Sequence, residues 1–169
     1  FRDTLRLMSS PLPCLHCGTP VPASRTDAFC CGGCQFVHDL LHNEGLERFY
    51  DLRGEKNLPP VPAQALRERD YEWLEQIVET AKANNEPQIT LSVQGMTCVG
   101  CVWLMERLFT KQAGSVQIDV DVLRGEIRLS GVPDVFDAIL FAKELQHFGY
   151  LVGPPQAQNA DKPASSGLE

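Results

Sequence analysis

The fold of this chain is decided by residues 88–109, which read QITLSVQGMTCVGCVWLMERLF. Polar and apolar side chains alternate over residues 88–94, which is the period of a strand with one buried face. Over residues 102–111 the apolar side chains recur every three or four positions, which predicts an amphipathic helix. Cys98 and Cys101 therefore lie in the loop between a strand and a helix, and we expect Cys101 at or near the start of that helix.

The two periods keep alternating beyond this stretch. They predict further strands at 116–122, 127–129 and 150–152 and a second helix at 135–148. The resulting order, β-α-β-β-α-β, is the ferredoxin-like arrangement. We therefore predict an α+β protein whose ferredoxin-like domain spans residues 87–153.

The rest of the chain divides into three further segments by composition. Residues 13–53 contain five cysteines and then a helical stretch, and we expect a small metal-binding module of the zinc-ribbon or treble-clef type. Residues 54–86 begin as a proline-containing linker and continue as an amphipathic helix over residues 63–84, with a firm start after Asp70. Residues 154–169 form a polar tail that we expect to be disordered.

Composition narrows the classes of function. The 169 residues carry a formal net charge of −7, which argues against nucleic acid as the main partner because phosphates need a basic face. No run approaches the roughly 20 apolar residues of a membrane-spanning helix. The seven cysteines, an odd total in close pairs, fit metal ligation in a reducing compartment better than a disulfide framework. We expect a soluble, monomeric part of a longer protein.

The first group of cysteines offers one thiol more than a tetrahedral metal site needs. Its members are Cys14, Cys17, Cys30, Cys31 and Cys34, in two sets about a dozen residues apart, the spacing of paired zinc knuckles. Either Cys30 or Cys31 can pair with Cys34, and Phe29-Cys30 resembles the opening of one knuckle type, which favours Cys30. We expect Zn(II) here, or a second Cu(I), with the fifth thiol free or part of an adaptable copper site.

Three histidines lie near this group in the sequence. His38 comes four residues after Cys34 on the same side of the expected helix, so it could be a further ligand. A surface or half-buried histidine is the more common case, and the same holds for His42, one turn further along. We expect His16, inside the first knuckle, to be exposed.

Cys98 and Cys101 have the chemistry of a two-sulfur site. The unpaired N–H groups and the positive dipole end of a helix start favour the thiolate, which is the form that binds metal. No other Cys, His or carboxylate lies nearby in the sequence, so the pair offers two sulfurs only. Two soft thiolates select Cu(I) over Zn(II), which takes four ligands. We expect Met96 to pack beneath the loop rather than to bind metal.

Residues 88–153 resemble the heavy-metal-associated domain, which occurs in copper chaperones and at the N-termini of heavy-metal P-type ATPases. The likeness rests on the order of strands and helices, on Gly149-Tyr150 before the last strand, and on Gly95-Met96-Thr97-Cys98-Val99-Gly100-Cys101. The resemblance implies that Cys98 and Cys101 are the ligands of Cu(I) and that Met96 is a packing residue.

Residues 13–53 resemble the metal-binding domain that precedes the heavy-metal-associated domain in a subset of bacterial copper ATPases. The matching runs are Cys14-Leu15-His16-Cys17-Gly18, Phe29-Cys30-Cys31-Gly32-Gly33-Cys34-Gln35 and Gly45-Leu46-Glu47-Arg48-Phe49-Tyr50-Asp51-Leu52-Arg53. The presence of both modules in this order is more specific than either module alone.

The two resemblances together imply the N-terminal region of a bacterial copper-transporting P-type ATPase, on the cytoplasmic side of the inner membrane. The fragment would bind and exchange Cu(I) without being an enzyme, whereas its parent would be an ATP-driven membrane transporter that binds nucleotide. The implied partners are a copper chaperone and the catalytic and membrane domains of the parent.

Other functions stay open at this point. A thiol-disulfide oxidoreductase would use the Cys98/Cys101 dithiol, although such dithiols often follow a Trp, which is missing before Cys98. A zinc-stabilised protein-interaction module would depend on the first cysteine group alone. A mercury-binding domain is a chemical variant of the Cu(I) site.

Overall fold

The computed structural model describes residues 11–155, so most of the predicted tail lies outside the described residues. The helices are α1 (Gly32–Asn43), α2 (Arg48–Arg53), α3 (Glu72–Ala83), α4 (Val99–Thr110) and α5 (Ala138–His147), with a 3-10 helix, η1 (Ala63–Leu66). The strands are β1 (Ile89–Gln94), β2 (Ser115–Asp121), β3 (Glu126–Gly131) and β4 (Leu151–Gly153). No helix in this part of the chain is long and apolar enough to cross a membrane.

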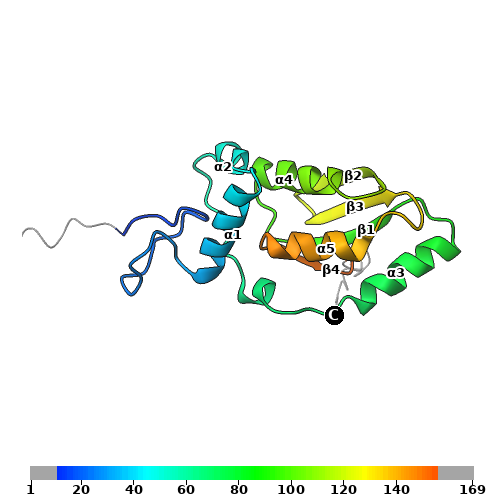
Figure 1. Ribbon diagram of the computed structural model, residues 1–169, viewed down its shortest axis with the longest axis horizontal. Helices are drawn as coiled ribbons and strands as arrows, with labels where there is room; N and C mark the ends of the chain where they lie inside the picture. The colour runs from blue at the N-terminus through cyan, green and yellow to red at the C-terminus, as the bar shows by residue number, and fades with distance from the viewer. Residues whose placement is uncertain (1–10, 156–169) are drawn as a thin grey trace, which may run out of the picture.

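The four strands form one antiparallel sheet in the order β2-β3-β1-β4 (Figure 1). Leu91 of β1 lies opposite Ile127 of β3, and Val93 lies opposite Val152 of β4. All four side chains are at most 4% exposed, so the alternation along β1 places one face of the sheet in the core.

α4 and α5 supply the other side of this core. Their buried apolar side chains include Leu104, Met105, Leu108, Phe109, Phe141, Ala142 and Leu145. The rings of Phe109 and Phe141 meet edge to face with centroids 5.4 Å apart, a favourable geometry for an aromatic pair. The protein is therefore a mixed α/β structure with a four-stranded antiparallel sheet, and the elements from β1 to β4 follow the predicted order.

Two helices begin elsewhere than the periodicity predicted, and capping gives the reason. α4 begins at Val99 rather than at residue 102, because Cys98 is already extended and acts as its N-cap (φ −151°, ψ 169°). α5 begins later than predicted, at Ala138. There the Asp137 carboxylate accepts hydrogen bonds from two N–H groups of the first turn, each at 3.0 Å.

The helix predicted over residues 63–84 is broken in two. η1 ends at Leu66, whose side chain is 53% exposed rather than part of a buried face. α3 begins only after Asp70, where the sequence predicted a firm start, because Asp70 Oδ1 accepts a hydrogen bond of 2.8 Å from the Glu72 N–H.

His16 is buried, so the prediction that it is exposed is wrong: its side chain is only 5% exposed. Its Nδ1 shares a hydrogen bond of 3.0 Å with Tyr50 Oη, and its ring stacks on Phe49. Arg53 also donates to the His16 carbonyl. These partners belong to α2, more than 30 residues further along the chain, so the sequence around His16 could not predict its burial.

The N-terminal region and the sheet share one continuous apolar core, and Gln146 of α5 adds a polar connection inside it. Its Nε2 donates to the carbonyls of Ala65 (3.1 Å) and Arg67 (2.6 Å), while its Oε1 accepts from Tyr71 Oη. Gln146 is 8% exposed, so it satisfies three polar groups of residues 65–71 away from water.

Replacing Gln146 by Leu should lower the free energy of unfolding by about 2 to 3 kcal/mol, because these polar groups stay buried without a partner. Urea unfolding followed by circular dichroism measures the loss. Gln117→Leu is the matched control, because Gln117 is exposed on β2 and should change stability by less than about 0.5 kcal/mol. Equal losses in the two variants would contradict the role of Gln146.

Acid should destabilise the protein through His16. Burial, helped by Arg53 and His38, lowers the pKa of His16 from 6.5 to about 4, so the unfolded state takes up a proton that the folded state excludes. The stabilisation is complete above the unfolded pKa and is lost as the pH falls toward 4, with a drop of about 2 kcal/mol between pH 7 and pH 5. Urea unfolding of His16→Phe should lack this part of the pH dependence, and an unchanged dependence would refute the assignment.

Candidate metal centres

Cys14 and Cys17 lie in a tight turn that begins the described chain. The Cys14 N–H donates to the Thr19 carbonyl at 2.8 Å, and the Gly18 N–H donates to the Cys14 carbonyl at 2.9 Å. Gly18 has a φ of +82°, in the left-handed region that glycine adopts without strain. The sequence between the two cysteines is thus folded back so that both sulfurs point to the same side.

Backbone N–H groups surround the sulfur of Cys14. Burial acts to raise the pKa of this thiol, but hydrogen bonds from the N–H groups of Cys17, Cys30 and His16 outweigh it and lower the pKa to about 7. Cys14 therefore supplies a thiolate near neutral pH, which is the form that ligates metal.

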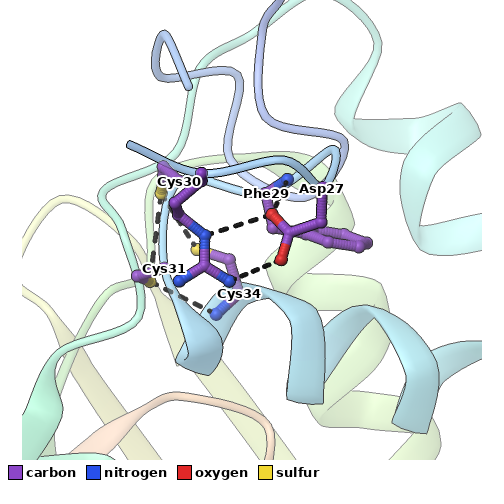
Figure 2. Close-up of polar contacts among 6 residues, drawn as sticks. Asp27, Phe29, Cys30, Cys31 and Cys34 are labelled. Atoms are coloured by element: carbon purple, nitrogen blue, oxygen red, sulfur yellow. Dashed lines mark hydrogen bonds and ion pairs between the residues drawn. The ribbon is translucent and has the colours of Figure 1, made fainter. Parts of the chain in front are cut away.

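Three more cysteines lie at the start of α1, and Figure 2 shows Cys30, Cys31 and Cys34 together there. Cys31 is the N-cap: it is extended, and its Sγ accepts a hydrogen bond of 3.4 Å from the Cys34 N–H. Just before it, Asp27 accepts from the Phe29 N–H at 3.2 Å and pairs with Arg25 at 2.7 Å, which holds the loop that leads to Cys30.

The sulfurs of Cys14, Cys17, Cys30 and Cys34 all lie within 4.8 Å of one another. Cys30 is central, 3.5 Å from the Cys17 sulfur and 3.6 Å from the Cys34 sulfur. Cys31 is not in this group: its sulfur caps the helix and lies 3.9 Å from the Cys30 sulfur. Among residues 11–155 this is the only set of three or more Cys, His, Asp or Glu side chains gathered so closely.

The donor set fits a soft, four-coordinate cation. Burial first, and then the neighbouring Cys17 thiol, raise the pKa of Cys30 to about 12, and burial raises that of Cys34 as well. Four thiolates would repel one another in so small a space, so a cation is needed to bind them in that form. Four thiolate ligands in a closed, buried shell are the usual composition of a structural zinc site, and thiolates also bind Cu(I).

The structure does not bring His38 into the group of four sulfurs. Its ring instead packs against Phe29, His42 and Tyr50, with centroids 4.2 to 5.4 Å away. Burial, and then the neighbouring His42, lower the pKa of His38. His38 and His42 are therefore parts of an aromatic cluster beside the thiols.

The second centre is the pair Cys98 and Cys101, whose sulfurs are 3.5 Å apart. Cys98 caps α4 and Cys101 lies in its first turn, where the Cys101 sulfur donates to the Gly95 carbonyl at 3.8 Å. Cys98 is 7% exposed and Cys101 is 1% exposed. No third Cys, His, Asp or Glu joins them among residues 11–155, so the described part of the chain offers two sulfurs here.

The environment of the pair differs from the sequence-based expectation in one respect. The helix start does place the N–H groups of Cys101 and Gly100 toward the Cys98 sulfur, which favours the thiolate. Burial, and then the adjacent Cys101 thiol, outweigh them and raise the pKa of Cys98. Without a cation, Cys98 therefore holds its proton more firmly than a free thiol does.

Tyr150 and Met96 lie on the core side of the loop that carries Cys98 and Cys101. Both are buried, Met96 at 7% and Tyr150 at 5% exposure, and Met96 lies in the apolar core. A Cβ added to Gly95 would come within 3.3 Å of the Tyr150 ring, and Gly95 has a φ of +103°. Burial and the neighbouring Cys101 raise the pKa of Tyr150, so its hydroxyl stays neutral.

Sequence reasoning missed the residues that cover this loop. A Cβ added to Gly100 would lie 2.9 Å from the Phe49 carbonyl oxygen and 3.2 Å from the Arg53 nitrogen, so α2 lies directly on the start of α4. Lys56 Nζ donates to the Thr97 carbonyl. These contacts join residues 41 or more positions apart, and no signal in either segment marks them.

Comparison with known proteins adds a family and several similar folds. Residues 13–76 match the family described as "Putative metal-binding domain of cation transport ATPase". A search of curated protein sequences finds no match.

Three solved structures are each similar to 38% of this chain. A copper binding domain from HMA7, a P-type ATPase, is 22% identical over 88% of its own length, with a TM-score of 0.36. The CopZ metallochaperone is 23% identical over 97%, with a TM-score of 0.37. The "putative copper-ion-binding protein" from Bacillus anthracis str. Ames is 30% identical over 92%, with a TM-score of 0.35.

The family match spans the whole group of four sulfurs, from Cys14 to Cys34, together with α1 and α2. Residues 13–76 are therefore similar to the metal-binding domains of cation transport ATPases.

Proposed function

We propose that this chain is the Cu(I)-binding region of a bacterial copper-translocating P-type ATPase, on the cytoplasmic side of the inner membrane. Cys98 and Cys101 receive Cu(I) from a copper chaperone and pass it toward the membrane and catalytic domains of the parent. The observation that carries this proposal is the pair of sulfurs 3.5 Å apart on the loop at the start of α4, with no third ligand among residues 11–155.

The geometry of the pair suits Cu(I) as a transported ion. Two thiolates satisfy Cu(I), whereas Zn(II) takes four ligands and leaves a two-sulfur site unfilled. An ion held by two sulfurs also has room for a third. A chaperone thiolate can therefore bond to the copper before the bond to one of the two cysteines breaks. The ion is then transferred between the proteins by ligand exchange, without being released into solution.

We assign the first centre a structural role, with Zn(II) held by Cys14, Cys17, Cys30 and Cys34 in a knuckle-and-helix arrangement of the zinc-ribbon or treble-clef kind. The gathering of four sulfurs, three of them on buried cysteines, supports this assignment, because structural zinc sites take four protein ligands. A second Cu(I) is the alternative occupant. The module of residues 13–53, the connector of residues 54–86 and the domain of residues 87–153 are the units we propose.

A thiol-disulfide oxidoreductase is a weaker interpretation of the Cys98/Cys101 pair. A redox-active cysteine needs a lowered pKa, whereas burial and Cys101 raise the pKa of Cys98. The parent would carry the ATP-driven chemistry, and this region would have no catalytic residue of its own.

Cu(I) titration of the zinc-loaded protein tests the main proposal. One equivalent of Cu(I) should bind, and Cys98→Ser should abolish that equivalent because a single thiolate cannot compete with a chelator. Anaerobic competition with bicinchoninate measures both. Cys31→Ser is the matched control and should still bind one equivalent. The Cys31 sulfur caps α1 and is not part of the loop that carries Cys98 and Cys101. Equal Cu(I) binding by the Cys98→Ser protein would reject the proposal.

Zinc competition separates the two candidates for the fourth ligand of the first centre. Cys30→Ser should weaken zinc binding by more than the roughly 10- to 100-fold that loss of an outer-shell partner costs. Cys31→Ser should weaken it much less, because the Cys31 sulfur is outside the group of four. Competition with a chromogenic chelator gives both affinities. The reverse order of effects would exclude the assignment of Cys30.

A further inference from the structure

The loop that carries Cys98 and Cys101 is covered by residues 49–58 of the N-terminal region. Both cysteines are nearly inaccessible, at 7% and 1% exposure, although Val99 between them is 67% exposed. The loop is therefore open on the side of Val99 and closed on the side of Gly100.

α2 closes the Gly100 side. The Phe49 carbonyl oxygen and the Arg53 nitrogen lie 2.9 Å and 3.2 Å from the position of a Gly100 Cβ, so only glycine permits this approach. Figure 1 shows α2 at the end of α4 where the loop joins it. Gly100, one of the two residues between Cys98 and Cys101, thus lies against the backbone of α2.

Lys56 fastens the segment that follows α2. Its ammonium group donates to the carbonyl of Thr97, the residue before Cys98, and Lys56 itself is exposed. A charge-assisted hydrogen bond at the surface is worth more than a neutral one but is open to water. This contact can therefore form and break without disturbing the core.

The same segment is attached to the first metal centre on its other side. The Leu58 N–H donates to the Cys17 carbonyl at 2.8 Å, and Arg53 donates to the His16 carbonyl. Residues 49–58 thus lie between the two centres and are bonded to both.

Packing beneath this segment is incomplete. A cavity of about 190 Å³ lies among Leu58, Pro59, Pro60, Cys101 and Tyr150. Side chains that line a cavity lack partners on one side and lose fewer dispersion contacts when they move. Of residues 49–58, Phe49 and Leu58 border this cavity, so the packing of the segment against Cys101 is incomplete at these two positions.

Transfer of Cu(I) by exchange of thiolates requires an incoming sulfur to reach the ion. We propose that residues 49–58 form a cover that has to leave the Cys98/Cys101 loop before a partner thiol reaches that site, and that Lys56 is the latch of the cover. The inference rests on the proposed function for its purpose, but the cover itself is a property of the protein with or without copper.

The rate of thiol alkylation tests the cover. The zinc-loaded chain of 169 residues is treated with iodoacetamide, and peptide mass spectrometry follows Cys98 and Cys101. Lys56→Met should speed their alkylation by about threefold to tenfold, the factor that corresponds to the net contribution of one ordinary hydrogen bond, because water screens the charge of the exposed Lys56. Lys82→Met is the matched control, since Lys82 loses a surface contact with Asp134 at 2.9 Å and should leave the rate unchanged.

A second variant tests the cover without changing Lys56. Gly100→Ala places a methyl group against the Phe49 carbonyl and should separate α2 from α4, with an increase in alkylation at least as large as that of Lys56→Met. Lys56 is exposed, so the Lys56→Met protein should keep its circular dichroism spectrum and decides the matter if Gly100→Ala fails to fold.

The outcomes separate the cover from the proposed function. Alkylation of Lys56→Met at the rate of Lys82→Met, in a protein that binds Cu(I) at Cys98 and Cys101, would overturn the cover alone. Faster alkylation in a protein that binds no Cu(I) there would support the cover and overturn the proposed function. Faster alkylation together with faster loss of Cu(I) to bicinchoninate supports both.

Discussion

The convergence of four cysteine sulfurs is the constraint on which the N-terminal half of the protein depends. Residues 11–31 contain no helix and one isolated bridge, between residues 13 and 20, so backbone pairing alone does not fix them. Cys14, Cys17 and Cys34 are among the most buried residues of the region, at 2%, 0% and 0% exposure. Their sulfurs join the knuckle to the start of α1. The Cys17 carbonyl also accepts a hydrogen bond from the Leu58 N–H. Leu58 belongs to residues 49–58, which cover Cys98 and Cys101, so the fold around the first cysteine group also helps to position this segment.

The two cysteine centres differ in their number of sulfurs and in the part of the chain that covers them. The first has four sulfurs within 4.8 Å of one another, and the pKa of one of these thiols, Cys14, is lowered to about 7. The second has two sulfurs at a helix start, covered by residues 49–58, whose contacts include a surface hydrogen bond from Lys56. We interpret the first as a resident structural ion and the second as the place where an ion arrives and leaves. The segment bonded to both gives the first centre a direct physical connection to the second.

The sequence predicted the elements from β1 to β4 because each alternates or repeats within its own few residues. It placed the start of α4 too late because the extended conformation of Cys98, which fixes that start, leaves no trace in the periodicity. The closeness of four cysteines in two knuckles was also readable, whereas the choice between Cys30 and Cys31 depends on which sulfur caps α1. The burial of His16 and the contact of Lys56 with Thr97 join positions 34 and 41 residues apart. A single sequence holds no local signal for such pairs.

The central claim is that the two centres hold different ions in different shells. Anomalous scattering from crystals of the protein loaded with both metals tests this most directly, with data collected on either side of the copper and zinc absorption edges. We expect a zinc peak among Cys14, Cys17, Cys30 and Cys34 and a copper peak between Cys98 and Cys101. A copper peak in the group of four sulfurs, with none between Cys98 and Cys101, would contradict it.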